Sequence, residues 1–198
     1  MAKEISDPVQ PDCLPSPERA AALIAGRRTI NSFRPELPPR SLIRRGISLA
    51  RWAPNHHLTE PWNFYLIGPR TRDGIVALNA ELVAAGKGAE AAEAKRSRWS
   101  AIPGWLAVTC NRSDDGLRQR EDYAACACAI QNLSLYLWSE GVGTKWTTGA
   151  VTREARFYDL LWIDPEQEEV VGLIWYGYPA ESPRTHRSGV DVALVDLP

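Results

Sequence analysis

Apolar and polar residues alternate along the chain in blocks that predict a mixture of helices and short strands. Helical spacing of apolar residues is found in five stretches, and short apolar runs typical of buried strands are found in three. The predicted helices are 17–26, 39–52, 71–101 with a break at Gly86 to Gly88, 123–140 and 153–162, and the predicted strands are 63–68, 105–110 and 170–178. Because helices and strands alternate and helices dominate, the pattern predicts an α+β fold.

The predicted helix 123–140 differs from the others because apolar residues occupy most of its faces. Only Gln131, Asn132 and Ser134 interrupt a run of alanine, cysteine, leucine and isoleucine. A helix of this kind is usually central in a domain or lies in a subunit interface.

The length and charge of the chain exclude several classes of protein. With 198 residues, 44% of them hydrophobic, the chain can form one domain with a real core. Its formal charge of -1 provides no net positive charge to attract nucleic acid or an anionic membrane. No apolar run approaches the roughly 20 residues of a membrane helix. We therefore expect neither a nucleic-acid partner nor a membrane partner.

The chain has four cysteines, none of which form a CxxC motif: Cys13, Cys110, Cys126 and Cys128. A chain with this much apolar content needs no disulfide framework, so the simplest expectation is a reduced, cytoplasmic setting.

The chain divides into three parts. Residues 1–17 are polar and carry four prolines, which predicts an irregular N-terminal arm. Residues 18–188 form the main domain, and residues 189–198 form a tail with an apolar run at 190–197. Because an exposed apolar tail is unfavourable on a monomer, we expect this tail to pack on a partner subunit.

The first polar cluster is GRRTINSF at residues 26–33, directly after a predicted helix. Two arginines beside a hydroxyl suit a phosphate, because guanidinium groups bind phosphate oxygens in a fork geometry. The alternative is a solvated helix end, where paired arginines are common.

The second cluster is WAPNHHLTEPW at residues 52–62. A rigid loop rich in rings fits a pocket for a flat heterocycle, and a packed connection between helix and strand is the alternative. A metal site is not expected, because adjacent histidines seldom share one ion and the HExxH order is absent.

The third cluster is GVGTKWTTG at residues 141–149, in which glycines allow the backbone to approach a ligand. It is neither a GxGxxG fingerprint nor a Walker motif. The chain also lacks a GxSxG elbow and a visible carboxylate pair. An organic cofactor that supplies the chemistry fits this absence better than a hydrolase does.

Read in order, the clusters resemble the FMN-dependent nitroreductase family, in particular its short branch of roughly 200 residues. The likeness extends from about residue 19 to residue 187. It is carried by Arg27-Arg28-Thr29 with Phe33, by Trp52 to His57 with Thr59 to Trp62, by Gln131-Asn132-Leu133 within the long helix, by Gly141-Val142-Gly143 with Trp146 to Gly149, and by Val170 to Gly172 with Gly177 to Pro179.

The resemblance implies a nitroreductase-like fold, with a central, mainly antiparallel sheet flanked by helices, in an intertwined homodimer with two FMN sites at the interface. It implies that Arg27, Arg28 and Thr29 hold the phosphate and ribityl chain, with Arg184 and Arg187 (or His186) from the tail. It further implies that the partner's loop brings Pro54, Asn55, His56 and His57 to the ring, and that Trp146, Thr147, Thr148 and Gly149 line the ribityl chain and the ring edge.

One departure from the family concerns Asn31. The family usually has Arg or Lys at this position, near the pyrimidine edge of the flavin, where the cation stabilises the anionic reduced form. Asn31 can still donate a hydrogen bond, and Arg34 is an alternative cation. We therefore expect the two-electron potential to be lower than is usual for the family.

The resemblance implies an oxidoreductase that takes hydride from NAD(P)H and passes it to nitroaromatic, quinone or enone acceptors in two half-reactions. His56 is the candidate proton donor, and the alternative is that both histidines only pack against the ring. Two rival functions stay open: a module that stores or senses FMN with little turnover, and a specialised flavin dehydrogenase or dehalogenase on the same fold. The substrate lid is expected within residues 71–103.

Overall fold

The computed structural model describes residues 14–197, so most of the predicted N-terminal arm, and Cys13 with it, lies outside the described residues. Helix α1 (Pro17–Gly26) begins where the sequence predicts, because the Ser16 hydroxyl accepts a hydrogen bond from the backbone N–H of Arg19 and Pro17 occupies the first turn.

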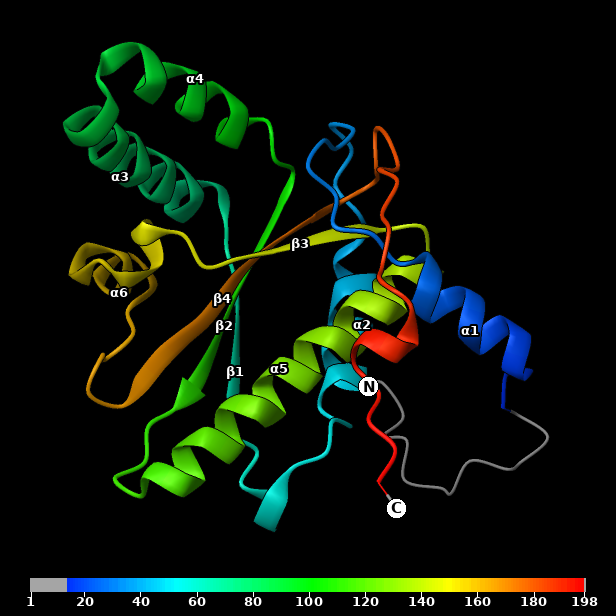
Figure 1. Ribbon diagram of the computed structural model, residues 1–198. Helices are drawn as coiled ribbons and strands as arrows, with labels where there is room; N and C mark the ends of the chain where they lie inside the picture. Colours follow the sequence, from blue (N-terminus) through cyan, green and yellow to red (C-terminus); the bar gives the residue numbers. More distant parts are fainter. Residues whose placement is uncertain (1–13, 198) are drawn as a thin grey trace.

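A four-stranded antiparallel sheet forms the centre of the molecule (Figure 1). Its strands lie in the order β1 (Trp62–Leu66), β2 (Gly104–Asn111), β4 (Glu168–Gly177) and β3 (Gly143–Thr147). All three strand pairs are antiparallel, and a bulge interrupts the β2–β4 pairing between Val108 and Thr109. The two edges of the sheet are therefore β1 and β3.

Helices cover both faces of the sheet, so the molecule has two cores. The long helix α5 (Gly116–Ser139) and helix α2 (Arg40–Ala50) pack on one face, against Leu106 and Val108 of β2. Helices α3 (Pro69–Lys87), α4 (Ala89–Ser100) and α6 (Ala155–Leu161) belong to the other side, where Trp105 and Ala107 point. The alternation of side chains along β2 thus divides its residues between the two cores.

Three tryptophans form the centre of the second core. The rings of Trp99, Trp105 and Trp175 lie 5.1–5.7 Å apart, with Trp99 edge-on to the other two. They come from α4, β2 and β4, so they join the helical pair α3–α4 to the sheet.

The prediction of an α+β fold with a mainly antiparallel sheet is confirmed, and so is the break between two helices at Gly88. Strand β3 was not predicted, and α5 begins seven residues before the predicted start at residue 123. None of the helices between residues 14 and 197 is long and apolar enough to cross a membrane.

Candidate functional site

The segment that follows α1 lies beside the edge strand β3. Thr29 forms a parallel bridge with Thr144, and the backbone N–H of Ile30 donates to the Thr144 carbonyl at 3.0 Å. The Ile30 side chain is fully buried, and a Cβ on Gly143 would lie 2.4 Å from Ile30 Cγ1. Glycine at position 143 therefore permits the close approach that brings two of the three polar clusters of the sequence together.

The two arginines at the end of α1 are used differently. Arg28 Nη1 donates to the carbonyls of Ala25 and Arg27, at 2.5 and 3.0 Å, and so caps the helix C-terminus. The Nε of Arg27 is buried and has no hydrogen-bond partner among residues 14–197. A buried guanidinium donor without an acceptor is costly, so Arg27 is well suited to an anionic oxygen of a ligand.

Asn31 contacts a lysine that sequence reasoning did not single out. Lys145 Nζ donates to Asn31 Oδ1 at 2.7 Å and lies over the ring of Trp175, 5.1 Å from its centroid. Burial, followed by repulsion from Arg98 and Lys95, lowers the pKa of Lys145. The structure thus places a cation of β3 beside Asn31.

Trp146, Thr147, Thr148 and Gly149 continue the same edge of the sheet. Trp146 Nε1 donates to the Val171 carbonyl at 3.1 Å, and a Cβ on Gly172 would lie 2.0 Å from that nitrogen. The Trp146 side chain therefore lies flat across β4 while remaining 40% exposed. Thr148 and Gly149 are exposed, so their backbone groups are accessible to a ligand.

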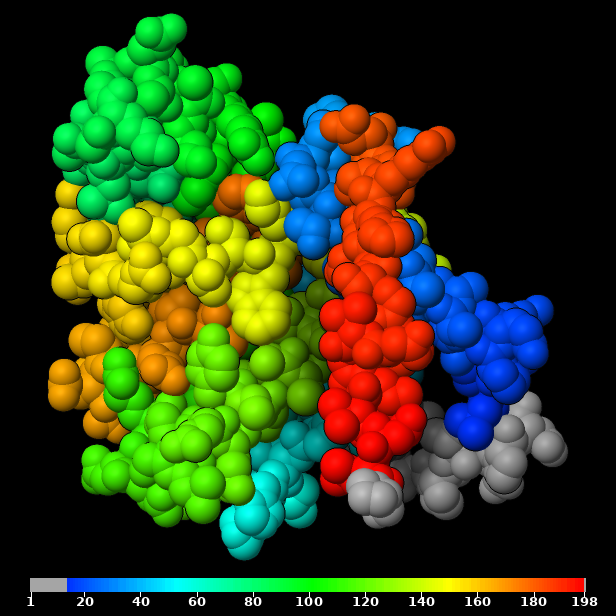
Figure 2. Space-filling model, in the orientation of Figure 1, coloured from blue at the N-terminus to red at the C-terminus, as the bar shows by residue number. Residues whose placement is uncertain are grey.

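The tail begins beside this cluster. After β4, the N–H of Ala180 donates to the Ser32 carbonyl at 3.0 Å, and the N–H of Arg34 donates to the Tyr178 carbonyl at 2.8 Å. The basic residues Arg184, His186 and Arg187 follow, and all three are exposed. Figure 2 shows the rest of the tail as a strip down the surface, with residues 190–197 in red.

The histidine loop, residues 55–60, lies apart from the residues beside β3 in the single chain. Residues 55–60 lie near the first turns of α5, at the bottom of Figure 1, whereas β3 crosses the upper half of the sheet. His56 Nδ1 is 2.8 Å from Glu121 Oε2, and the rings of His56 and His57 stack at 3.9 Å. Pro54, Asn55, His56 and His57 are thus not brought to Arg27 within one chain.

The loop is held in an unusual conformation. His57, Leu58 and Glu60 all have positive φ angles, of 58°, 51° and 43°. Such residues cost of order 1 kcal/mol or more each and persist only where surrounding contacts fix them. Asn55 supplies two of these contacts, to Thr59 Oγ1 and to the N–H of Glu60, and Thr59 donates to the carboxylate of Asp122, which is 4% exposed. Strain at a well-fixed, exposed loop is typical of a functional segment.

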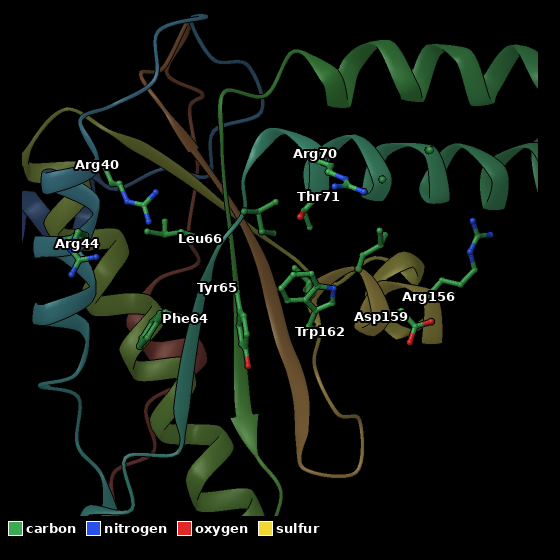
Figure 3. A pocket seen from close by; sticks show the side chains of 15 residues that line it. Arg40, Arg44, Phe64, Tyr65, Leu66, Arg70, Thr71, Arg156, Asp159 and Trp162 are labelled. Carbon is green, nitrogen blue, oxygen red and sulfur yellow. The ribbon is translucent and has the colours of Figure 1, made fainter.

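A hollow of about 1130 Å³ lies at the opposite edge of the sheet, beside β1 (Figure 3). Arginines from three helices line it together with apolar residues of β1: Arg40, Arg44, Arg70, Arg156, Phe64 and Leu66. None of the predicted cofactor residues lines this hollow. The dispersed arginines gave no local motif by which the sequence could have indicated it.

Comparison with known proteins decides the family. Residues 24–178, which include the first and third clusters and the histidine loop, match the model of the Nitroreductase family. The chain belongs to the nitroreductase family. The resemblance to this family that the sequence indicated is therefore confirmed.

Relatives of this nitroreductase-family chain agree over most of its length. It is 27% identical over 169 residues to the Bacillus subtilis protein named "Putative NAD(P)H nitroreductase YfhC", covering 83% of this chain and 87% of that protein. The crystal structure of a nitroreductase-like family protein from Bacillus cereus superposes with a TM-score of 0.79 at 26% identity, covering 89% of this chain and 95% of that chain. NfnB of Mycobacterium smegmatis shares the fold with a TM-score of 0.73 at 18% identity, covering 91% of this chain and 99% of that chain. The nitroreductase-like fold predicted from the sequence is thus confirmed.

Proposed function

We propose that the chain is an FMN-dependent NAD(P)H oxidoreductase that reduces electron-poor substrates of the nitroaromatic, quinone or enone class. The observation that carries the proposal is the contact of Thr29, Ile30 and Asn31 with Thr144 and Lys145 of β3, the strand that leads into Trp146 to Gly149. Family membership and the nitroreductase name of the B. subtilis relative support it. NfnB of M. smegmatis is described as FMN-dependent and in complex with NADPH.

The residues at β3 fit the parts of FMN. The buried Nε of Arg27 lacks an acceptor, which a phosphate oxygen would supply. The hydroxyl of Thr29 suits the ribityl chain, and the exposed backbone at Thr148 and Gly149 suits the polar edge of the ring. We propose that Arg184 and Arg187 (or His186) of the exposed tail complete the phosphate site.

When bound, FMN supplies the hydride acceptor and donor, so the protein needs no acid–base pair of its own. The role of the chain is then to orient its two substrates in turn on one face of the ring and to exclude water. Trp146, which is fixed across β4, provides a rigid wall for this purpose. The nucleotide must leave before the acceptor binds, which makes the kinetics ping-pong.

We propose that the site is completed by a second copy of the chain. The histidine loop lies away from β3 within one chain, so Pro54 to His57 can contribute to the ring pocket only from a partner. His56 would present Nε2 to the substrate, because its Nδ1 is taken by Glu121 at 2.8 Å. An unchanged turnover of His56→Ala at every pH would exclude His56 as a proton donor.

We also propose a reduced, cytoplasmic setting. Cys110, Cys126 and Cys128 are free thiols, of which the first two are buried. The neighbouring thiol of Cys110, followed by burial, raises the pKa of Cys126. Thiols of this kind behave as small apolar side chains and need no oxidising compartment.

The test is an absorbance spectrum of the purified protein followed by anaerobic titration with NADPH and NADH. We expect flavin bands near one FMN per chain that bleach on addition of NAD(P)H and recover with a quinone. Flavin that stays oxidised would favour the storage or sensor function. A colourless protein that cannot be loaded with FMN would contradict the proposal.

A further inference from the structure

Three cations from two elements lie close enough to repel one another, and one of them contacts Asn31. Lys145 lies on β3, and Lys95 and Arg98 lie on α4. Lys145 and Lys95 lie over the rings of Trp175 and Trp99, which themselves stack edge-on at 5.1 Å. Among residues 14–197, none of the three cations forms an ion pair.

This cation cluster is electrostatically unfavourable in the protein alone. Burial lowers the pKa of Lys145, and repulsion from Arg98 and Lys95 lowers it further. An anion that binds between β3 and α4 would stabilise the charged form of Lys145 that burial disfavours. It would also neutralise the repulsion among the three cations. The cluster therefore indicates an anion site.

The position of Lys145 favours a ring-borne charge over a phosphate. Lys145 is held at 2.7 Å by an amide oxygen and projects from the strand that also carries Trp146 and Thr147. Phosphates suit the fork geometry of a guanidinium, which Arg27 supplies at the end of α1, four residues before Asn31. A lysine acts instead as a point charge, which suits an anion delocalised over a planar ring.

We propose that Lys145, oriented by Asn31, stabilises the negative charge of the reduced flavin ring and replaces the cation that is missing at position 31. The inference rests on the proposed FMN site. Hydride transfer from NAD(P)H adds two electrons and one proton to the ring and leaves NAD(P)+, so the ring gains one negative charge. A cation fixed beside that charge binds the reduced ring more tightly than the oxidised ring.

The inference is tested by the affinities of oxidised and reduced FMN for Lys145→Met. We expect the affinity for reduced FMN to fall at least tenfold more than the affinity for oxidised FMN. For a two-electron couple, a tenfold change in this ratio equals a fall of about 30 mV in midpoint potential. Spectroelectrochemical titration of the bound flavin and fluorescence titration of the apoprotein measure the two quantities.

Three further variants separate this role from a structural one. Lys145→Arg keeps the charge and should hold the potential near that of the natural chain. Asn31→Ala frees Lys145 and should lower the potential by less than Lys145→Met does. Lys87→Met removes an exposed lysine at the end of α3 and should change nothing. Melting of the apoprotein should change little for Lys145→Met, because the loss of the contacts with Asn31 and Trp175 is offset by relief of the repulsion from Arg98 and Lys95.

Each other outcome overturns the inference. An unchanged potential in Lys145→Met, with FMN bound and bleached by NADPH, would refute the role of Lys145 and leave the proposed function intact. An unchanged potential with a raised KM for NADPH but not for NADH would assign the cluster to the nucleotide phosphate. A natural chain that binds no FMN would refute both proposals together.

Discussion

The side chains of Arg27 and Arg28 are adjacent in sequence but differ in what their nitrogens contact. Arg28 already caps the carbonyls of Ala25 and Arg27, whereas the buried Nε of Arg27 has no partner. We therefore expect Arg27→Ala to weaken FMN binding about ten- to hundredfold, the value of a charge-assisted hydrogen bond of about 1.5–3 kcal/mol. Fluorescence titration of the apoprotein with FMN measures this loss.

Two control variants make this prediction specific. Arg27→Lys should restore little affinity, since an ammonium lacks the planar fork of a guanidinium. Arg19→Ala removes an exposed arginine from the first turns of α1 and should leave FMN affinity unchanged. Equal affinities of Arg27→Ala and the natural chain would show that Arg27 does not bind the phosphate.

Residue-level reasoning from the sequence identified the cluster at β3 but not all of its members. The family resemblance assigned the segment 26–33 and the segment 141–149 to one FMN site, and the structure pairs Thr29 of the first with Thr144 of the second. Lys145 was missed because a lysine among glycines and threonines gives no motif. Only the strand alternation, which directs Lys145 toward Trp175 and Trp146 toward Gly172, reveals which side chains share a face.

At the scale of the element, Gly172 fixes how β3 packs on β4. A Cβ at this position would lie 2.0 Å from Trp146 Nε1, so Gly172→Ala must displace the indole and break its hydrogen bond to Val171. We expect a loss of about 1–3 kcal/mol in the free energy of unfolding, as for an overpacked core. Thermal unfolding measures this loss, and FMN affinity should fall with it because Trp146 moves.

A second glycine gives a matched control. Gly86 lies in the last turn of α3, and a Cβ there would meet no atom within 4 Å. Gly86→Ala should therefore stabilise the protein by about 0.5–1 kcal/mol through helix propensity alone. If Gly172→Ala melts at or above the temperature of Gly86→Ala, the packing of Trp146 does not limit this position.

The elements that the sequence predicted well are those with strong periodicity or clear boundaries. Helix α1 has Ser16 and Pro17 at its start, and the break between α3 and α4 falls at Gly88, whose φ is 83°. Strand β3 was missed because its five residues contain no continuous apolar run and its pairing with β4 is a long-range contact. The early start of α5 was missed because its first turns are polar, although Asp115 caps them.

At the scale of the whole molecule, the tail leaves apolar surface uncovered. Four apolar side chains of this short segment are 69–85% exposed: Val190, Val192, Val195 and Leu197. The hollow beside the edge strand β1 also has apolar walls and is surrounded by arginines (Figure 3). Asp159 also lines the hollow and Arg156 is paired with Glu81, so Arg40, Arg44 and Arg70 leave it a positive charge. Asp191 and Asp196 of the tail complement this charge. We propose that the tail of one copy occupies the hollow of the other.

This arrangement predicts that removal of the tail weakens both dimerisation and FMN binding. A chain ending at Ser188 should dissociate at concentrations where the full chain is a dimer, and it should lose FMN, because Pro54 to His57 would no longer reach the partner's ring pocket. Arg44→Glu in the hollow should weaken the dimer in the same direction, whereas Arg96→Glu on α4 should not. Sedimentation with detection at flavin and protein wavelengths follows both properties at once. An intact dimer that retains FMN without residues 189–198 would show that the interface lies elsewhere, with the apolar helix α5 as the next surface to test.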